Sequence, residues 1–161
     1  MKTKKHIAIR FAISGFTLLE LVLMMSLIGI VSVGVYSNMT PHSMNMYVDA
    51  AVLKVVHDLR FAQDRAMITG RNHGFRSYST TQYEIYDTSA GNPITDPSTQ
   101  GSMVINLNSD YPNVAFAATY QVEFNSLGAP VIGGGGSVTL GNGTESKSFS
   151  LTSNTGLINL P

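Results

Sequence analysis

The chain has 161 residues, with ten basic and ten acidic side chains and no cysteine. The lack of cysteine excludes disulfides, thiolate metal sites and cysteine nucleophiles, so burial alone must hold the fold together. Four of the ten basic residues lie in the first ten positions, and the chain after Gly15 has six basic and ten acidic residues, a net charge of −4. Because phosphate binding needs clustered Lys and Arg, no nucleic acid partner is expected.

Residues 1–15 are predicted to be a basic leader peptide. The segment places four basic residues ahead of an apolar stretch: Lys2, Lys4, Lys5 and Arg10. Positive charge stays on the cytoplasmic side of a membrane, so the N-terminus is expected in the cytoplasm and the C-terminal domain outside it. The small residues Ser14 and Gly15 precede the apolar stretch, so a cut after Gly15 would leave that stretch attached as an anchor.

Residues 16–36 are predicted to form a transmembrane helix that is also the assembly half of a longer helix. The twenty residues from Phe16 to Val35 are nearly all apolar, and at about 1.5 Å per residue they span roughly 30 Å, the thickness of a bilayer core. Hydroxyls in this stretch can bond to the helix backbone, and glycines leave room for a second helix. These residues are Thr17, Ser26 and Ser32, and Gly29 and Gly34.

Glu20 is a carboxylate inside this apolar helix. An unpaired charge costs on the order of 2.5–3.5 kcal/mol at the bilayer centre and less near an end, so it usually has a partner. A cut after Gly15 would create a free amine at Phe16, and a neighbouring copy shifted along the helix axis could present that amine to Glu20. The alternative is that Glu20 lies near the membrane surface and reaches water.

Residues 37–70 are predicted to contain a kink and then the amphipathic half of the helix. Pro41 lacks an N–H and disfavours helix at Thr40, so a kink or a loosened turn is expected there. Apolar residues then recur at spacings of four and three, at Val48, Val52, Val55, Leu59, Ala62 and Ala66. The remaining surface is expected to carry Lys54, Asp58, Arg60, Asp64 and Arg65. Gly70 is the expected end of the helix.

Residues 71–161 are predicted to form a β-rich globular domain. Period-two patterns and turn residues mark seven candidate strands: Gly74–Ser79, Gln82–Tyr86, Met103–Asn108, Tyr120–Phe124, Ser137–Leu140, Lys147–Leu151 and Gly156–Leu160. The run from Gly133 to Gly136 is expected to be a flexible hairpin loop, and residues 87–113 receive no structural prediction. The predicted fold class is α+β, with a long N-terminal helix packed on a C-terminal antiparallel sheet.

The motif Gly15-Phe16-Thr17-Leu18-Leu19-Glu20, with the basic leader and the apolar helix, resembles the class III signal of type IV pilins and type II secretion pseudopilins. The resemblance implies that a prepilin peptidase cuts between Gly15 and Phe16 and methylates the Phe16 amine. It also implies that Thr17, Leu18, Leu19 and Glu20 take part in assembly, with Glu20 paired to the N-terminus of an adjacent subunit. The implied partners are this peptidase, other pilin or pseudopilin subunits, an inner-membrane assembly platform and, before assembly, lipid.

The C-terminal half is similar to the ending of the GspH/FimT group of minor pilins and pseudopilins, on the segments Val122–Gly128, Ser137–Leu140 and Leu151–Ile158. This implies a bacterial inner-membrane protein with a periplasmic domain that later enters a filament. Without cysteine, the disulfide-bounded loop of many major pilins cannot form. The calcium loop of major pseudopilins has no counterpart, because Asp87, Asp96 and Asp110 are scattered.

No enzymatic role, metal or cofactor is expected. The chain has no Gly-x-Ser-x-Gly motif with an acid–base pair. His6 lies in the leader, and His42, His57 and His73 are expected to be solvated. Two alternatives remain open: a DNA-binding or adhesive tip minor pilin that serves natural transformation or attachment, and a single-pass anchored β-domain that never assembles.

Overall fold

The computed structural model describes residues 15–160, and the side chains of residues 34–44 lie outside that description. The chain divides into two compact units, Met1–Thr40 and Pro41–Pro161. One helix, α1 (Leu18–Thr69), belongs to both units, and each unit is described by itself below. Apart from Gly15, the predicted leader lies outside the described residues.

The first unit consists of the N-terminal part of α1, and its apolar side chains are exposed. From Phe16 to Val33 the exposed fraction of every large apolar side chain is between 51% and 84%. The Ser26 hydroxyl donates to the Val22 carbonyl at 2.8 Å and the Ser32 hydroxyl to the Ile28 carbonyl at 2.7 Å, so both hydroxyls are satisfied within the helix as predicted. Among the described residues, no helix is both long and apolar enough to cross a membrane.

The helical backbone of α1 continues through Ser37–Pro41, where the sequence predicted a kink or a loosened turn. Pro41 lacks one backbone donor, and the residues on both sides of it are helical, so the loss of that donor does not end the helix. The predicted end of the helix is confirmed. Gly70 follows Thr69 with a φ of 68°, and its N–H donates to the Ala66 carbonyl at 3.0 Å.

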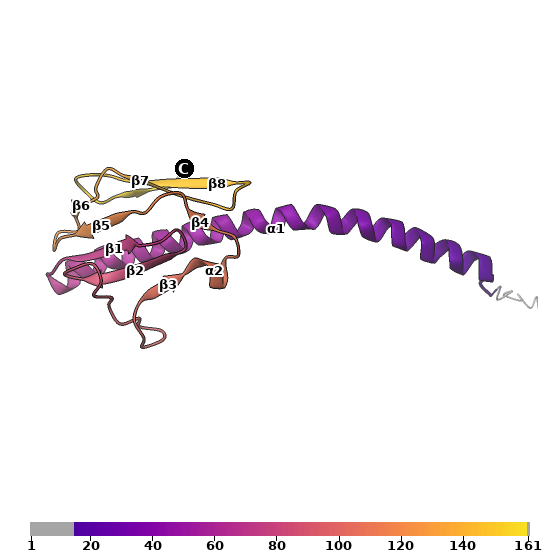
Figure 1. Cartoon of the computed structure of the whole chain (residues 1–161), viewed down its shortest axis with the longest axis horizontal. Helices are drawn as coiled ribbons and strands as arrows, with labels where there is room; N and C mark the ends of the chain where they lie inside the picture. The colour runs from indigo at the N-terminus through magenta and orange to yellow at the C-terminus, as the bar shows by residue number, and fades with distance from the viewer. Residues whose placement is uncertain (1–14, 161) are drawn as a thin grey trace, which may run out of the picture. The chain divides into compact units, whose positions relative to one another are not determined.

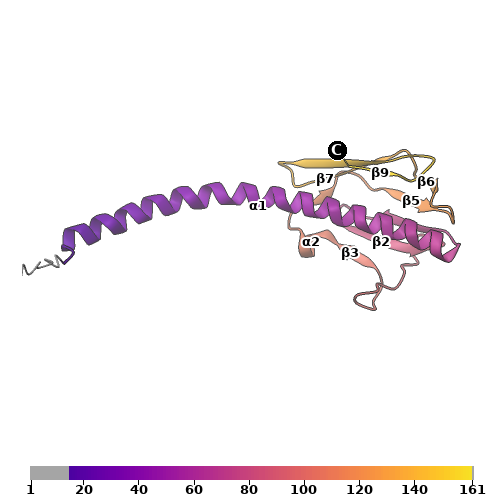
Figure 2. The same cartoon turned by 180° about the vertical axis from the view of Figure 1, so that it is seen from behind.

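The second unit contains two antiparallel sheets (Figures 1 and 2). The five-stranded sheet has the order β3 (Val104–Asn106), β2 (Gln82–Asp87), β1 (His73–Ser77), β5 (Gln121–Phe124) and β6 (Pro130–Ile132). The four-stranded sheet has the order β4 (Ala115–Phe116), β7 (Ser137–Gly141), β8 (Ser146–Leu151) and β9 (Ile158–Asn159). Together with α1, these sheets confirm the predicted α+β class.

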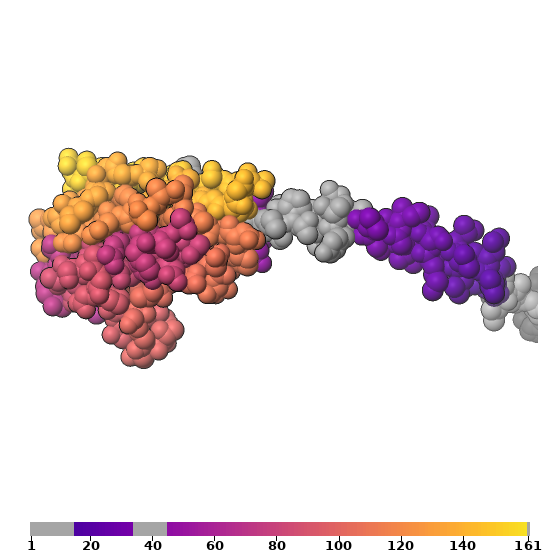
Figure 3. Space-filling view, viewed as in Figure 1, coloured from indigo at the N-terminus to yellow at the C-terminus, as the bar shows by residue number. Residues whose placement is uncertain are grey.

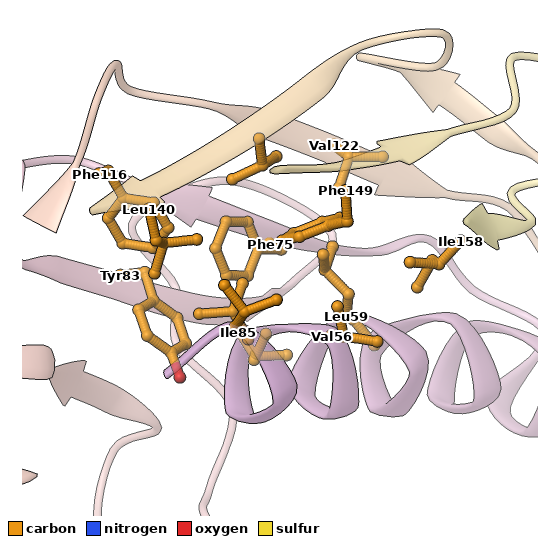
Figure 4. Packing of buried hydrophobic residues seen from close by; sticks show 14 of the residues in the cluster. Val56, Leu59, Phe75, Tyr83, Ile85, Phe116, Val122, Leu140, Phe149 and Ile158 are labelled. Carbon is orange, nitrogen blue, oxygen red and sulfur yellow. The ribbon is translucent and has the colours of Figure 1, made fainter. Parts of the chain in front are cut away.

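The hydrophobic core lies between the second half of α1 and the two sheets (Figure 4). All six residues of the predicted apolar stripe, from Val48 to Ala66, are at most 4% exposed. Side chains of both sheets and of the helix pack together there: Val56, Leu59, Phe75, Ile85, Leu140 and Phe149. The Phe75 and Tyr83 rings lie 5.0 Å apart between centroids. The amphipathic half of α1 is therefore the element around which the domain folds.

The predicted strand Met103–Asn108 is too long. Strand β3 ends at Asn106, and a single helical turn, α2 (Leu107–Asp110), follows it. The Asn106 side chain accepts the Asn108 N–H at 3.1 Å, which is the local capping that Asn favours over continued strand pairing. Strands β4 and β6 were not predicted, because two or three residues carry too little alternation to be recognised.

The glycine run Gly133–Gly136 is not a flexible hairpin loop, because β6 and β7 belong to different sheets. The run is fixed to the end of β8, where the Gly135 N–H donates to the Leu151 carbonyl at 2.8 Å and the Leu151 N–H to the Gly136 carbonyl at 2.9 Å. Gly133 has a φ of 72°, and a Cβ there would overlap the Gln121 carbonyl oxygen. Close packing of the backbone, rather than flexibility, explains these glycines.

The segment between β2 and β3, for which the sequence made no prediction, stands out from the domain as a loop (Figure 3). Its base is held to β2 by the Gly91 N–H, which donates to the Glu84 carboxylate at 2.7 Å, and by the Ile94 N–H, which donates to the Ile85 carbonyl at 2.9 Å. The Met103 N–H closes the loop on the Ile94 carbonyl at 2.8 Å. The loop is thus anchored at both ends.

Asp58 is buried, although the sequence placed it on the charged surface of α1. It is 1% exposed, and its carboxylate accepts from the Lys54 ammonium at 2.7 Å and from the Tyr83 hydroxyl at 2.7 Å. Burial raises the pKa of the Tyr83 phenol far above its usual value, and the Asp58 carboxylate adds to that shift. The carboxylate therefore ties α1 to β2 through a neutral hydroxyl.

Replacing Tyr83 by Phe should lower the free energy of unfolding by about 1–3 kcal/mol, because the buried Asp58 carboxylate loses a donor. Urea unfolding of the domain, followed by circular dichroism, measures this change. Tyr78→Phe is the matched control, since Tyr78 is 41% exposed and should change stability by less than about 0.5 kcal/mol. Equal effects of the two substitutions would contradict the role given to Asp58.

Candidate functional site

The helix α1 begins inside the predicted assembly motif. Residues 15–17 are not helical, and Leu18 is the first residue of the helix. The Thr17 carbonyl accepts the Leu21 N–H at 3.2 Å, and its hydroxyl oxygen accepts the Glu20 N–H at 3.2 Å. Thr17 is thus the N-cap and Glu20 the third helical residue, the spacing of a capping box. A cut between Gly15 and Phe16 would fall just ahead of this cap.

The Glu20 carboxylate lies in the first turn of α1, where the helix dipole favours negative charge. No ion pair joins it to any residue that the structure describes. Its apolar neighbours point outward, with Phe16 at 76%, Leu18 at 84% and Leu19 at 71% exposure. The first turn therefore combines one carboxylate with an exposed apolar surface.

Gly29 stands in the interior of the apolar part of α1, and a Cβ built there would meet nothing within 4 Å. A glycine inside a helix costs about 1 kcal/mol relative to alanine. Nothing in the described chain crowds this position, so the glycine has no packing reason within the molecule. It is suited to close approach by a second helix, as the sequence suggested.

His73, the first residue of β1, is buried, whereas the sequence predicted that it would be solvated. It is 1% exposed, and its Nε2 lies 2.9 Å from the Thr69 hydroxyl and 3.7 Å from the Asp87 carboxylate. Burial lowers the pKa of His73 below its usual value, while the Asp87 charge acts in the opposite direction. The neutral His73 side chain thus joins the last turn of α1 to the C-terminal end of β2.

The remaining histidines and the three aspartates named in the sequence analysis form no shared site in the described part of the chain. His57 is solvated as expected, with its side chain 79% exposed, whereas His6 and the side chain of His42 lie outside the description. Asp87 pairs with Arg71 at 3.1 Å, and Asp96 accepts the Ser98 N–H at 2.7 Å. Over the described residues, no group of three or more His, Asp or Glu is placed to hold a metal ion.

The outer face of the five-stranded sheet carries a polar network that the sequence did not predict. Tyr86 is buried there because Gly74 has no side chain, and a Cβ at Gly74 would overlap the Tyr86 ring. The Glu123 carboxylate accepts from the Tyr86 hydroxyl at 3.3 Å and from the Asn72 amide at 2.8 Å. A glycine within a strand was the available signal of such close approach.

A family model described as "Type II transport protein GspH" matches residues 51–156, about two thirds of the chain. The chain belongs to the GspH family. This confirms the similarity to GspH/FimT minor pilins and pseudopilins that was read from the C-terminal half. The match covers the buried part of α1 and nearly all of the β-domain, and it does not reach the segment from Gly15 to Glu20.

Two solved structures of the type IV minor pilin FimU of Pseudomonas aeruginosa, in space groups P65 and P21, are similar to this chain. Their identities are 15% and 16%, both with a TM-score of 0.48. The alignments cover 70% and 71% of this chain, and 91% and 87% of the FimU chains. No protein with a curated description matches the chain.

The buried His73 predicts a loss of stability at acidic pH. Burial holds the pKa of His73 in the folded state below the ordinary histidine value of 6.5, so the unfolded chain gains a proton first as the pH falls through that value. The free energy of unfolding should therefore decrease from pH 6.5 downward, as measured by urea titration at several pH values. His73→Gln should flatten this decrease, because it removes the imidazole that takes up the proton. An unchanged pH dependence in His73→Gln would show that His73 does not cause the loss of stability at acidic pH.

Proposed function

We propose that this member of the GspH family is a minor pilin or pseudopilin that enters a type II secretion or type IV pilus filament through the first half of α1. The observation that carries the proposal is the exposed apolar surface from Phe16 to Val33, which begins at a capped first turn with a single carboxylate. A helix that is apolar on all sides requires burial by lipid or by other helices. The proposed role is packing, without a chemical reaction.

Processing is proposed to occur between Gly15 and Phe16, by a prepilin peptidase that also methylates the Phe16 amine. The bond lies in a non-helical, exposed stretch, and a Cβ at Gly15 would meet nothing within 4 Å. An exposed segment without secondary structure is accessible to a peptidase. Because the Thr17 cap lies beyond the bond, removal of the leader would leave the first turn of the helix intact.

Before assembly, residues 16–36 are proposed to anchor the protein in the bacterial inner membrane, with the leader in the cytoplasm and the domain in the periplasm. Glu20 lies near one end of this segment, so its charge disfavours the lipid-embedded state by less than the roughly 2.5–3.5 kcal/mol of a charge at the bilayer centre. In the filament, the Phe16 amine of an adjacent subunit would supply the missing positive charge. The lower free energy of the paired Glu20 carboxylate in the filament favours transfer of the subunit from the membrane, through the assembly platform, into the filament.

The amine that pairs with the Glu20 carboxylate is proposed to come from another subunit, because of the geometry of the Thr17 cap. The Thr17 hydroxyl already accepts the Glu20 N–H, and this fixes the first turn close to the cleaved end. Within one helix, the Phe16 amine and the Glu20 carboxylate are separated by this capped turn. A second helix shifted along the axis can present its amine to the carboxylate without disturbing either cap.

The mature protein should begin at Phe16 with one methyl group on its amine. Mass spectrometry of the N-terminal peptide from cells that contain the peptidase measures this directly. Gly15→Leu should leave the leader attached, because a large side chain would occupy the cleavage position, whereas Gly29→Ala should be processed normally. A mature chain that starts at any other residue would overturn the processing proposal.

Glu20→Gln should be processed normally but should be lost from the filament, because the neutral amide cannot pair with the Phe16 amine. The measurement is the amount of subunit in the sheared filament fraction relative to the membrane fraction. Ser26→Ala is the control, since the Ser26 hydroxyl bonds only within its own helix in the described chain. Normal incorporation of Glu20→Gln into the filament fraction would contradict the pairing of Glu20 with the Phe16 amine. Absence of the unmodified chain from that fraction would favour an anchored domain that never assembles.

A further inference from the structure

A polar hollow in the second unit, with a volume of about 280 Å³, has no part in the function proposed above. The end of α1, the start of β1, the end of β2 and the base of the loop between β2 and β3 all contribute to its walls. Its lining includes Arg65, Arg71, His73, Asp87, Asn92 and Thr95. The hollow therefore brings two guanidiniums and one carboxylate together from four parts of the chain.

The Arg65 guanidinium is the charge in this hollow that lacks a counter-charge. Arg65 is exposed on α1, about one turn before the helix ends at Thr69. No ion pair joins it to an acidic residue in the described ranges. Arg71, in contrast, pairs through Nη2 with the Asp87 carboxylate at 3.1 Å. The two arginines and the aspartate thus leave one positive charge in excess.

His73 does not change this balance of charge. Burial lowers the pKa of His73 against the effect of the Asp87 charge, and the charges of Arg65 and Arg71 lower the pKa further. The imidazole is therefore neutral at pH 7. Because a charge shifts a pKa strongly only from nearby, the same effect indicates that both guanidiniums lie close to one imidazole.

The wall that carries Asp87 is held in a strained conformation. Thr88 has a φ of 66°, in the left-handed region that a β-branched residue rarely adopts. Its hydroxyl donates to the Asp87 carboxylate at 2.8 Å, and its N–H donates to the Asn72 carbonyl at 3.0 Å. The Asn92 amide donates to the Asp87 carbonyl at 3.3 Å. Strain of this kind persists where contacts impose it, and it clusters at binding sites.

We propose that this hollow binds a carboxylate group, with the Arg65 guanidinium as its principal partner. A guanidinium presents paired N–H donors that match the two oxygens of a carboxylate. A single carboxylate neutralises the one excess positive charge, whereas a phosphate dianion would leave negative charge beside Asp87. The Arg71 guanidinium retains donors besides Nη2 and can add a second contact.

Free organic acids and acidic side chains of polypeptides share this chemistry, so the first probe is acetate. Acetate is exchanged for chloride at constant ionic strength, with the full-length chain in detergent micelles, and the backbone amide signals of Asn92 and Thr95 are followed by NMR. These signals should shift and reach saturation. Arg65→Gln should weaken acetate binding by about tenfold or more, because the charged donor is lost.

Arg60→Gln is the matched control, since Arg60 is also exposed on α1, makes no ion pair in the described ranges and lies outside the hollow. It should change acetate binding by no more than about twofold. Shifts that grow without saturation, or an equal loss of binding in the two variants, would overturn the proposal. Tighter binding of inorganic phosphate than of acetate would contradict the assignment to a carboxylate.

A second probe separates the two sources of the carboxylate. It is the blocked peptide acetyl-Gly-Glu-Gly-amide, compared with the same peptide carrying Gln in place of Glu. Tighter binding of the Glu peptide than of acetate, without binding of the Gln peptide, assigns the site to an acidic side chain of another polypeptide. Binding no tighter than that of acetate assigns it to a free organic acid. Both probes are added to unassembled subunits, so failure of this proposal leaves the proposed filament function standing.

Discussion

The need to bury the apolar surface between Phe16 and Val33 is the constraint on which the rest of the structure depends. The described chain offers these side chains no partner, and their exposure of 51–84% cannot persist in water. The Glu20 carboxylate, near one end of this segment, opposes burial in lipid, because an unpaired charge is costly in an apolar medium. The apolar segment thus needs burial, and the carboxylate makes burial among helices that supply a positive charge more favourable than burial in lipid. An assembly of such helices, with an amine beside each carboxylate, satisfies both requirements.

The second half of the same helix meets a different requirement. Its stripe from Val48 to Ala66 lies in the core of the β-domain, so the domain cannot be separated from α1 without losing that core. Asp58 and Gln63 add polar contacts to the packing: one ties α1 to β2, and the other ties it to two loops. The helix therefore connects the surface proposed for assembly to a domain whose loops it also positions.

Features that depend on local spacing were predictable from the sequence, and features that depend on distant partners were not. The stripe, the end of α1 at Gly70 and most strands follow from periodicity and turn residues. Asp58 continues the apolar spacing of Ala51, Val55 and Ala62, but only Tyr83 and Lys54 explain how a carboxylate can occupy that face. Burial of His73 likewise depends on Asp87 as well as on nearby Thr69, and the close packing of Gly133 depends on Gln121 of β5. The family was predictable from the motifs. The cap that joins Thr17 to Glu20 was missed, although its three-residue spacing is a local signal of a capping box.

We propose above that Glu20 of one subunit pairs with the Phe16 amine of another. The most direct measurement is the structure of the assembled filament, in which the distance from the Phe16 nitrogen to the Glu20 carboxylate of the adjacent copy can be read. The account predicts a separation of no more than about 4 Å, the limit of an ion pair. A filament in which Glu20 faces solvent, or lies far from every Phe16 nitrogen, would contradict it.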